Sequence, residues 1–174
     1  AALGSILALL LQDLLGLEIP LIALLAALLH AARLGLWAPL KTRGRPILWI
    51  LHLSYAWIVA HLVLRGLAGY DLVAAALPTH ALTVGAIGGI TLGMMTRTAR
   101  GHTGRPLETG TAELAAYLMV QAAAVACVLL PLALPGAYLE LMLASGVLWS
   151  AAFAVFTIAF FPILSRPRVD GRPG

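Results

Sequence analysis

Histidines are the residues of this sequence whose type and placement favour chemistry. Five occur among the 174 residues, and apolar runs contain or border four of them, namely His30, His52, His61 and His80. A polar side chain at membrane depth is energetically costly, so such residues are functional candidates. Neutral imidazole is the commonest metal ligand and a standard axial ligand of haem iron. The four histidines therefore predict metal or haem binding, with hydrogen bonding between helices as the alternative.

Helical spacing assigns these histidines to different faces. His30 shares a helix face with Trp37, and His52 shares one with Tyr55, because residues three, four or seven apart lie together. His30 and His52 flank the same basic loop, so we expect them at similar depth, where the pair could ligate one iron. His61 is nine residues beyond His52, which at about 100° per residue places it on the opposite side of the helix. We expect His61 only to bond a neighbouring helix.

Composition indicates that lipid surrounds this chain. Hydrophobic residues make up 61% of the sequence and charged residues only 10%, whereas a soluble domain carries about 25% charged residues. The net charge of +4 does not indicate nucleic acid, because the basic residues form short clusters between apolar runs. The middle of these runs lacks carboxylates, which disfavours a proton- or sodium-coupled carrier. The sequence also lacks a phosphate loop, a nucleophile elbow and an HExxH zinc motif, which argues against a soluble enzyme.

Six apolar segments are candidate membrane helices, since about 20 apolar residues cross a hydrocarbon core of about 30 Å. They are Leu3–Gly16, Pro20–Ala38, Ile47–Gly66, Pro78–Thr96, Ala112–Leu132 and Tyr138–Leu164. The first is the weakest candidate, because it is short and carries Gln12 and Asp13. We therefore predict an all-α, polytopic transmembrane helix bundle of about six spans, forming a single domain over residues 1–174.

Charged residues alternate between the connections of this predicted bundle. The connections around residues 39–46, 97–108 and 165–172 hold three basic residues each. The intervening connections hold Glu18, Asp71 and Glu140. By the positive-inside rule, we expect the basic connections and the C-terminus to face the cytoplasm.

Small residues form a stripe at the start of the fourth segment. Ala81, Gly85, Gly89 and Gly93 are spaced by four and therefore share one helix face. Such a stripe lets another helix approach closely, because lipid supplies no hydrophobic drive for helix pairing. Glycine also marks the close approach of a ligand, so the stripe could instead admit a flat cofactor. The sequence leaves both interpretations open.

The connection RTARGHTGRPLE places arginines around His102. Its glycines and proline are typical of tight turns. Arg97 and Arg105, with Arg100 between them, are suited to anionic lipid headgroups or to haem propionates. Guanidinium groups bind carboxylates in a bidentate manner, which supports the propionate interpretation.

Three stretches of the chain carry a family resemblance. They are LHAARLGLW (Leu29–Trp37), PILWILHLSYAW (Pro46–Trp57) and HALTVGAIGGITLGMMTRTARGHTGRPL (His80–Leu107). The third is long and specific, and together they resemble the bacterial NnrS proteins. That family is described as multi-spanning, haem- and copper-containing inner-membrane proteins associated with nitric oxide, denitrification and nitrosative stress. The resemblance implies the same membrane, the same cofactors and the same response for this chain.

The resemblance also implies which side chains matter. It implies metal ligation by His30, His52, His80 and His102, and haem binding by His30, His52 and His80 with Arg97 and Arg105. Family members are typically about twice this length, with roughly twelve membrane helices, so we expect a C-terminal half that docks on missing N-terminal helices. The resemblance implies no catalytic residue. A permease-like transport module and a purely structural half remain the alternatives.

Overall fold

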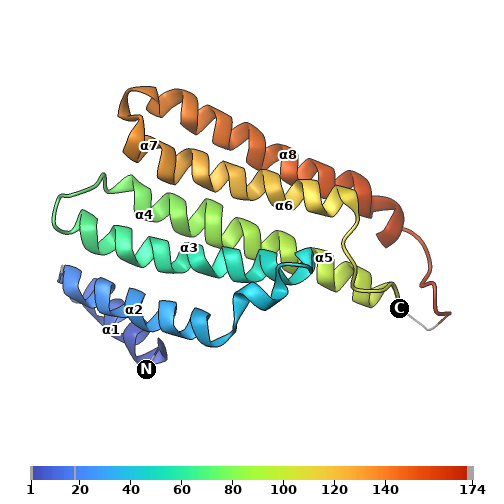
Figure 1. The fold of residues 1–174 in the computed structure, drawn as a ribbon, viewed down its shortest axis with the longest axis horizontal. Coiled ribbons are helices and arrows are strands. Elements are labelled where there is room, and N and C mark those ends of the chain that lie inside the picture. Colours follow the sequence, from blue (N-terminus) through green and yellow to red (C-terminus); the bar gives the residue numbers. More distant parts are fainter. Residues whose placement is uncertain (1, 18, 172–174) are drawn as a thin grey trace.

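The computed structural model describes residues 2–17 and 19–171, and over these it contains helices and no strands. Figure 1 shows the helices lying side by side along the long axis of the molecule. The first three are α1 (Ala2–Leu14), α2 (Pro20–Leu36) and α3 (Pro46–Ala68), with the short turn η1 (Pro39–Thr42) between α2 and α3. The predicted all-α fold is confirmed.

Three composite helices complete the bundle. The segment Ala76–His102 is built from α4 (Ala76–His80), η2 (Ala81–Gly88) and α5 (Gly89–His102). The segment Thr111–Ala133 is built from α6 (Thr111–Ala124), η3 (Val125–Leu129) and α7 (Leu130–Ala133). The last, Pro135–Leu164, joins η4 (Pro135–Ala137) to α8 (Tyr138–Leu164). These six helices correspond to the six apolar segments predicted from the sequence.

Four of the six helices are long and apolar enough to cross a membrane. Within the described residues, these are α3 and the three composite helices, of 23, 27, 23 and 30 residues. The helices α1 and α2 are also apolar but have only 13 and 17 residues, short of the about 20 that a full crossing requires. The chain is therefore a membrane protein with four full-length candidate spans and two shorter apolar helices.

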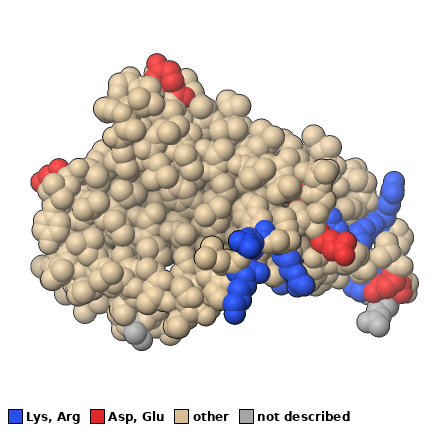
Figure 2. All heavy atoms as spheres, viewed as in Figure 1, with Lys and Arg blue, Asp and Glu red and all other residues tan. Residues whose placement is uncertain are grey.

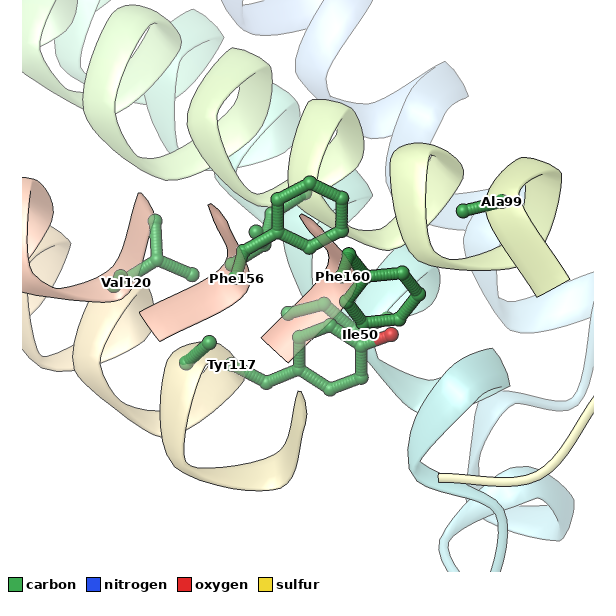
Figure 3. Close-up of a cluster of buried hydrophobic side chains, with 9 residues drawn as sticks. Ile50, Ala99, Tyr117, Val120, Phe156 and Phe160 are labelled. Atoms are coloured by element: carbon green, nitrogen blue, oxygen red, sulfur yellow. The ribbon is translucent and has the colours of Figure 1, made fainter. Parts of the chain in front are cut away.

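The helices pack in a simple order. The helix α1 lies on α2, α2 on α3, α3 on Ala76–His102, and α6 on α8. A buried apolar cluster around Ile50, Tyr117, Phe156 and Phe160 joins α3, α5, α6 and α8 (Figure 3). A second cluster joins α3 to η2 and η3, and a smaller one joins α1, α2 and Leu62 of α3. The N-terminal layer thus has the smallest core.

The glycine stripe of the fourth helix packs directly against α3. A Cβ added at Gly85 would collide with Trp57, and one added at Gly89 would collide with Ser54. At Gly93 an added Cβ would come within 3.0 Å of Ile50. The side chains of α3 therefore fill the space that the missing Cβ atoms leave. Of the two interpretations left open by the sequence, helix packing describes this face.

Two of the composite helices contain π-helical stretches where regular α-helix was expected. In η3, the stretch ends just before Pro131, which lacks an N–H and cannot complete the α-helical ladder. Near the start of η2, the Thr83 hydroxyl donates to the Thr79 carbonyl at 2.8 Å, a local bond that competes for a ladder acceptor. Periodicity alone does not reveal such stretches, because their composition remains apolar.

Charge is segregated along the bundle. Figure 2 shows lysines and arginines gathered toward one end of the molecule, with some acidic residues among them, while the opposite end of this face carries acidic residues on a largely uncharged surface. The basic end is where η1 and the connection between α5 and α6 lie. The fold thus places the predicted basic connections at one common end.

Candidate functional site

The side chain of His30 is held between α2 and α3. Its residue is only 3% exposed, in the half of α2 that leads to the basic connection. From α3, the Tyr55 hydroxyl lies 2.7 Å from His30 Nδ1, and the two rings stack with their centroids 5.8 Å apart. This hydrogen bond fixes the orientation of the imidazole. The predicted helix faces of His30 and Tyr55 therefore do meet across the interface.

The second ring nitrogen of His30 has no partner. Nε2 is buried and makes no hydrogen bond of regular geometry to any described residue, although the backbone of Ala2 at the start of α1 lies near the imidazole. Buried polar atoms are nearly always satisfied, so an orphaned one marks a position where a ligand is missing or strain is stored. A histidine whose Nδ1 is held by a hydrogen bond and whose Nε2 is free has the arrangement typical of metal-ligating histidines. Among the predicted ligands, His30 has this buried ring nitrogen without a hydrogen-bond partner, and its ligation of a metal or haem iron stays a prediction.

His52 shows a similar arrangement closer to the basic end. Its Nδ1 donates to the Leu48 carbonyl at 3.1 Å, since a carbonyl can only accept, and lies 3.4 Å from the Thr42 hydroxyl. In the neutral ring Nε2 is then left as the acceptor. The half-buried ring lines a hollow of about 450 Å³ with Leu34, Arg43 and other residues of η1 and α3. His52 is thus more accessible than His30.

Two aromatic rings connect these histidines. Trp37 packs edge-on against Tyr55, with the centroids 4.7 Å apart, and against His52 at 6.2 Å. Arg33 lies over Trp37, 5.0 Å from the ring centroid, as a cation–π contact. The structure therefore brings His30 and His52 into one aromatic cluster, and the contacts between them run through Tyr55 and Trp37. Ligation of one iron by both histidines stays a prediction.

His80 and His102 lie at opposite ends of the helix Ala76–His102. The half-buried His80 closes α4, whereas His102 is exposed at the end of α5. His102 lines an apolar hollow of about 640 Å³ together with Met94, Met95 and residues of α8. No group of three or more histidine, cysteine or acidic side chains suited to a metal occurs in the described part of the chain. The predicted roles of His80 and His102 stay predictions.

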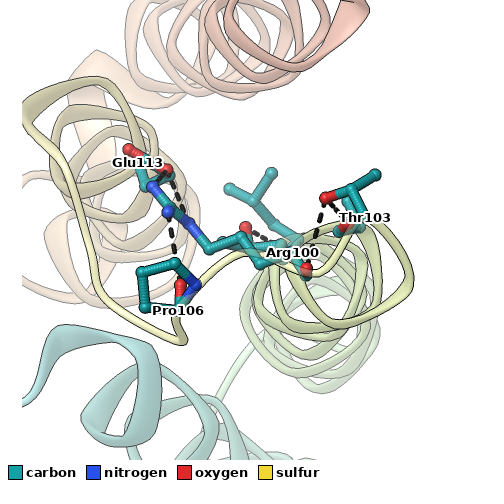
Figure 4. Close-up of polar contacts among 7 residues, drawn as sticks. Arg100, Thr103, Pro106 and Glu113 are labelled. Atoms are coloured by element: carbon teal, nitrogen blue, oxygen red, sulfur yellow. Dashed lines mark hydrogen bonds and ion pairs between the residues drawn. The ribbon is translucent and has the colours of Figure 1, made fainter. Parts of the chain in front are cut away.

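The arginines of the connection after α5 divide into two groups. Figure 4 shows Arg100 turned inward, where its guanidinium binds Glu113 at the start of α6 and lies 3.4 Å from the Pro106 carbonyl. Arg100 therefore holds the connection between α5 and α6 together, and its guanidinium is not available to a lipid headgroup or a propionate. Arg97 is half-buried and lines a shallow hollow, and Arg105 Nη1 is buried without a hydrogen-bond partner among residues 2–17 and 19–171. Only Arg97 and Arg105 keep donors for an anionic group.

The C-terminal tail folds back on this connection. Arg168 donates from Nη1 to the His102 carbonyl at 2.9 Å and from Nε to Asp170 at 2.9 Å. The hydrogen bond to Asp170 raises the pKa of the Arg168 guanidinium, which keeps this cation charged. The tail therefore adds to the basic end of the bundle and tethers it to the end of α5.

Comparison with known proteins identifies the family. The chain matches the family model described as NnrS protein over residues 1–168, which is essentially its whole length. It belongs to the NnrS family. No curated protein and no solved structure matches the chain significantly. Membership of the NnrS family supports, at the family level, a haem- and copper-associated membrane protein of the nitric oxide response.

This member of the NnrS family also contains a polar cluster that sequence reasoning missed. Trp57 donates from Nε1 to Gln121 at 2.8 Å, and the Gln121 amide nitrogen lies 3.3 Å from the Ser54 hydroxyl. All three side chains are buried; Ser54 and Gln121 lie against Gly89, and Trp57 lies against Gly85. The signal was present as the lone glutamine in the apolar run of α6. Because these groups satisfy one another, the cluster binds α3 to α6 and presents no free ligand atom.

Proposed function

We propose that this chain is a haem- and copper-binding part of a bacterial inner-membrane protein of the nitric oxide response, with His30 as a ligand of haem iron. The observation that carries this assignment is the buried, unpartnered Nε2 of His30. When bound, haem iron supplies a centre that takes diatomic ligands and exchanges electrons. In the same proposal, His52, His80 and His102 are the further metal ligands to test.

The neighbours of His30 have defined tasks in this proposal. The Tyr55 hydroxyl orients the imidazole through Nδ1, which keeps Nε2 as the coordinating atom. Tyr55 stacks on the imidazole and shields it from water, and Trp37 packs edge-on against Tyr55 from the other side of the cluster. At the basic end, Arg97 and Arg105 bind anionic groups, either propionates or lipid headgroups. Tyr55 and Trp37 already belong to the aromatic cluster around His30, and the two arginines retain N–H donors for an anionic group.

An absorption spectrum tests this assignment. The detergent-purified chain is expected to show a Soret band in the oxidised and dithionite-reduced states, and His30→Ala is expected to lose it. Leu28→Ala is the matched control, because Leu28 is exposed on the same helix two residues away. A His30→Ala variant that folds and keeps an unchanged Soret band contradicts the assignment. Circular dichroism of both variants shows whether each has folded.

The orientation proposed with this function follows from charge. The basic end carries η1, the connection after α5 and the tail, so we place it and the C-terminus in the cytoplasm. A single cysteine introduced at exposed Gly101 is expected to react with an impermeant maleimide only after the membrane is opened, and buried Cys127 is not expected to react. If Gly101→Cys is labelled in intact cells, the basic end faces the outside of the cell and the proposed orientation is wrong.

A further inference from the structure

A polar cavity lies at the end of the bundle opposite the basic connections. It has a volume of about 570 Å³ and is enclosed by the end of α1, the start of α2, the end of α3 and the start of α4. Six of its lining residues bear polar side chains, namely Gln12, Asp13, His61, Arg65, Asp71 and Thr79. The metal and haem assignments above use none of them. This concentration of polar groups is unusual in a chain whose residues are only 10% charged.

Two hydrogen-bond acceptors on the cavity wall are available to a bound group, and the first of them is buried without a partner. Gln12 is only 6% exposed, and its Oε1 makes no hydrogen bond within the residues that the structure describes. His61 donates from Nδ1 to the Pro78 carbonyl at 2.8 Å, which leaves Nε2 of the neutral ring as an acceptor. An acceptor buried without a donor is destabilising, so the cavity is built to receive donors. A bound group must therefore bring N–H or O–H bonds.

The charge of the cavity favours a cation. Arg65 and Asp13 form an ion pair, so their charges cancel. Asp71 lines the same cavity, and none of the ion pairs found among the described residues involves it. With His61 neutral, the described lining carries a net charge of minus one. An anion would face both this charge and the free acceptors, which disfavours it.

The available ligands also exclude a tightly held metal ion. The described part of the chain offers no group of three histidine, cysteine or acidic side chains around one point. A nitrogen cation with N–H bonds needs only acceptors, which Gln12, His61 and Asp71 supply. We propose that this cavity binds a primary ammonium group, carried either by a small amine or by an ethanolamine lipid headgroup.

Paired ligands that carry the same charge but differ in N–H donors test this proposal. Methylammonium is expected to raise the thermal unfolding temperature of the detergent-purified chain, whereas tetramethylammonium, which has the same charge and no N–H bond, is expected not to. In lipid nanodiscs, phosphatidylethanolamine is expected to stabilise more than phosphatidylcholine of the same acyl chains if the group comes from lipid. A response to methylammonium without a lipid difference assigns a small amine. Equal responses within both pairs overturn the proposal.

Matched variants locate the effect. Gln12→Leu is expected to weaken methylammonium binding about tenfold, because it removes a buried acceptor of a charged donor. Asp71→Asn is expected to weaken it several-fold, and its exposed position keeps the test valid if Gln12→Leu fails to fold. Glu140→Gln removes the same charge from an exposed residue outside the cavity and is expected to change nothing. An equal loss in Asp71→Asn and Glu140→Gln would place the cation elsewhere and overturn the proposal.

Discussion

Two polar clusters on α3 differ in how completely their groups are paired. The Ser54–Trp57–Gln121 cluster is buried, and its donors and acceptors bind one another across α3 and α6. The cluster of His30 and Tyr55 is also partly buried, but it leaves His30 Nε2 without a partner. A polar side chain in this bundle is therefore structural where other side chains satisfy its hydrogen bonds, and it is a ligand candidate where one of its polar atoms is left without a partner. The ion pair of Arg100 with Glu113 is likewise a structural contact, because each charge has its partner within the protein.

The largest expected effect is on the paired charges at the basic end. Glu113→Gln leaves Arg100 largely buried without its counter-charge and is expected to lower the free energy of unfolding by about 3 kcal/mol. The measurement is thermal unfolding in detergent, followed by circular dichroism. The double variant Arg100→Gln with Glu113→Gln is expected to recover much of the loss, because no charge is then left unpaired. If the double variant is no better than Glu113→Gln, the pair does not act as a unit.

The next effect concerns Gly89, which lies against Ser54 and Gln121 of the paired cluster. Gly89→Ala pushes a Cβ against Ser54 and against Gln121 Nε2, and is expected to lower the free energy of unfolding by about 1–3 kcal/mol. Gly146→Ala is the control, since a Cβ there meets nothing within 4 Å. The same unfolding measurement applies to both. Equal stability of the two variants would show that α3 can move away from the stripe at little cost.

Removing the centre of the paired cluster has a smaller expected effect. Gln121→Leu leaves the Trp57 indole N–H without its acceptor and is expected to lower the free energy of unfolding by about 1–2 kcal/mol. It is expected to leave the Soret band unchanged, which separates this cluster from that of His30. A changed Soret band in Gln121→Leu would show that the paired cluster also affects haem binding, which contradicts its purely structural role.

The smallest effect on stability is expected at the unpaired cluster. Tyr55→Phe removes the hydroxyl that orients His30 and is expected to weaken haem affinity about tenfold while changing the free energy of unfolding by about 1 kcal/mol or less. Haem titration followed at the Soret band measures the affinity. Tyr138→Phe, at an exposed position of α8, serves as the matched control. A change in stability without a change in haem affinity would make Tyr55 a packing residue.

Much of the architecture follows from composition and periodicity. The apolar runs predicted six helices, and the basic connections predicted one positively charged end, which Figure 2 shows. Spacing placed Tyr55 on the face of α3 that carries His52, and the structure finds its hydroxyl bonded to His30. Gln12 and Asp13 made the first segment the weakest candidate for a span, and α1 indeed has only 13 residues. In the structure, both line a polar cavity.

The apolar surroundings, the helices and the distribution of charge follow from the sequence alone, because these depend on local composition and on a regular 3.6-residue period. Which polar atoms are paired becomes clear only when the helices are packed together. His61 bonds the Pro78 carbonyl, Gln121 bonds Trp57, and His30 Nε2 bonds nothing that the structure describes. Pairing depends on groups from different helices meeting within about 3 Å, and neither composition nor periodicity carries that information.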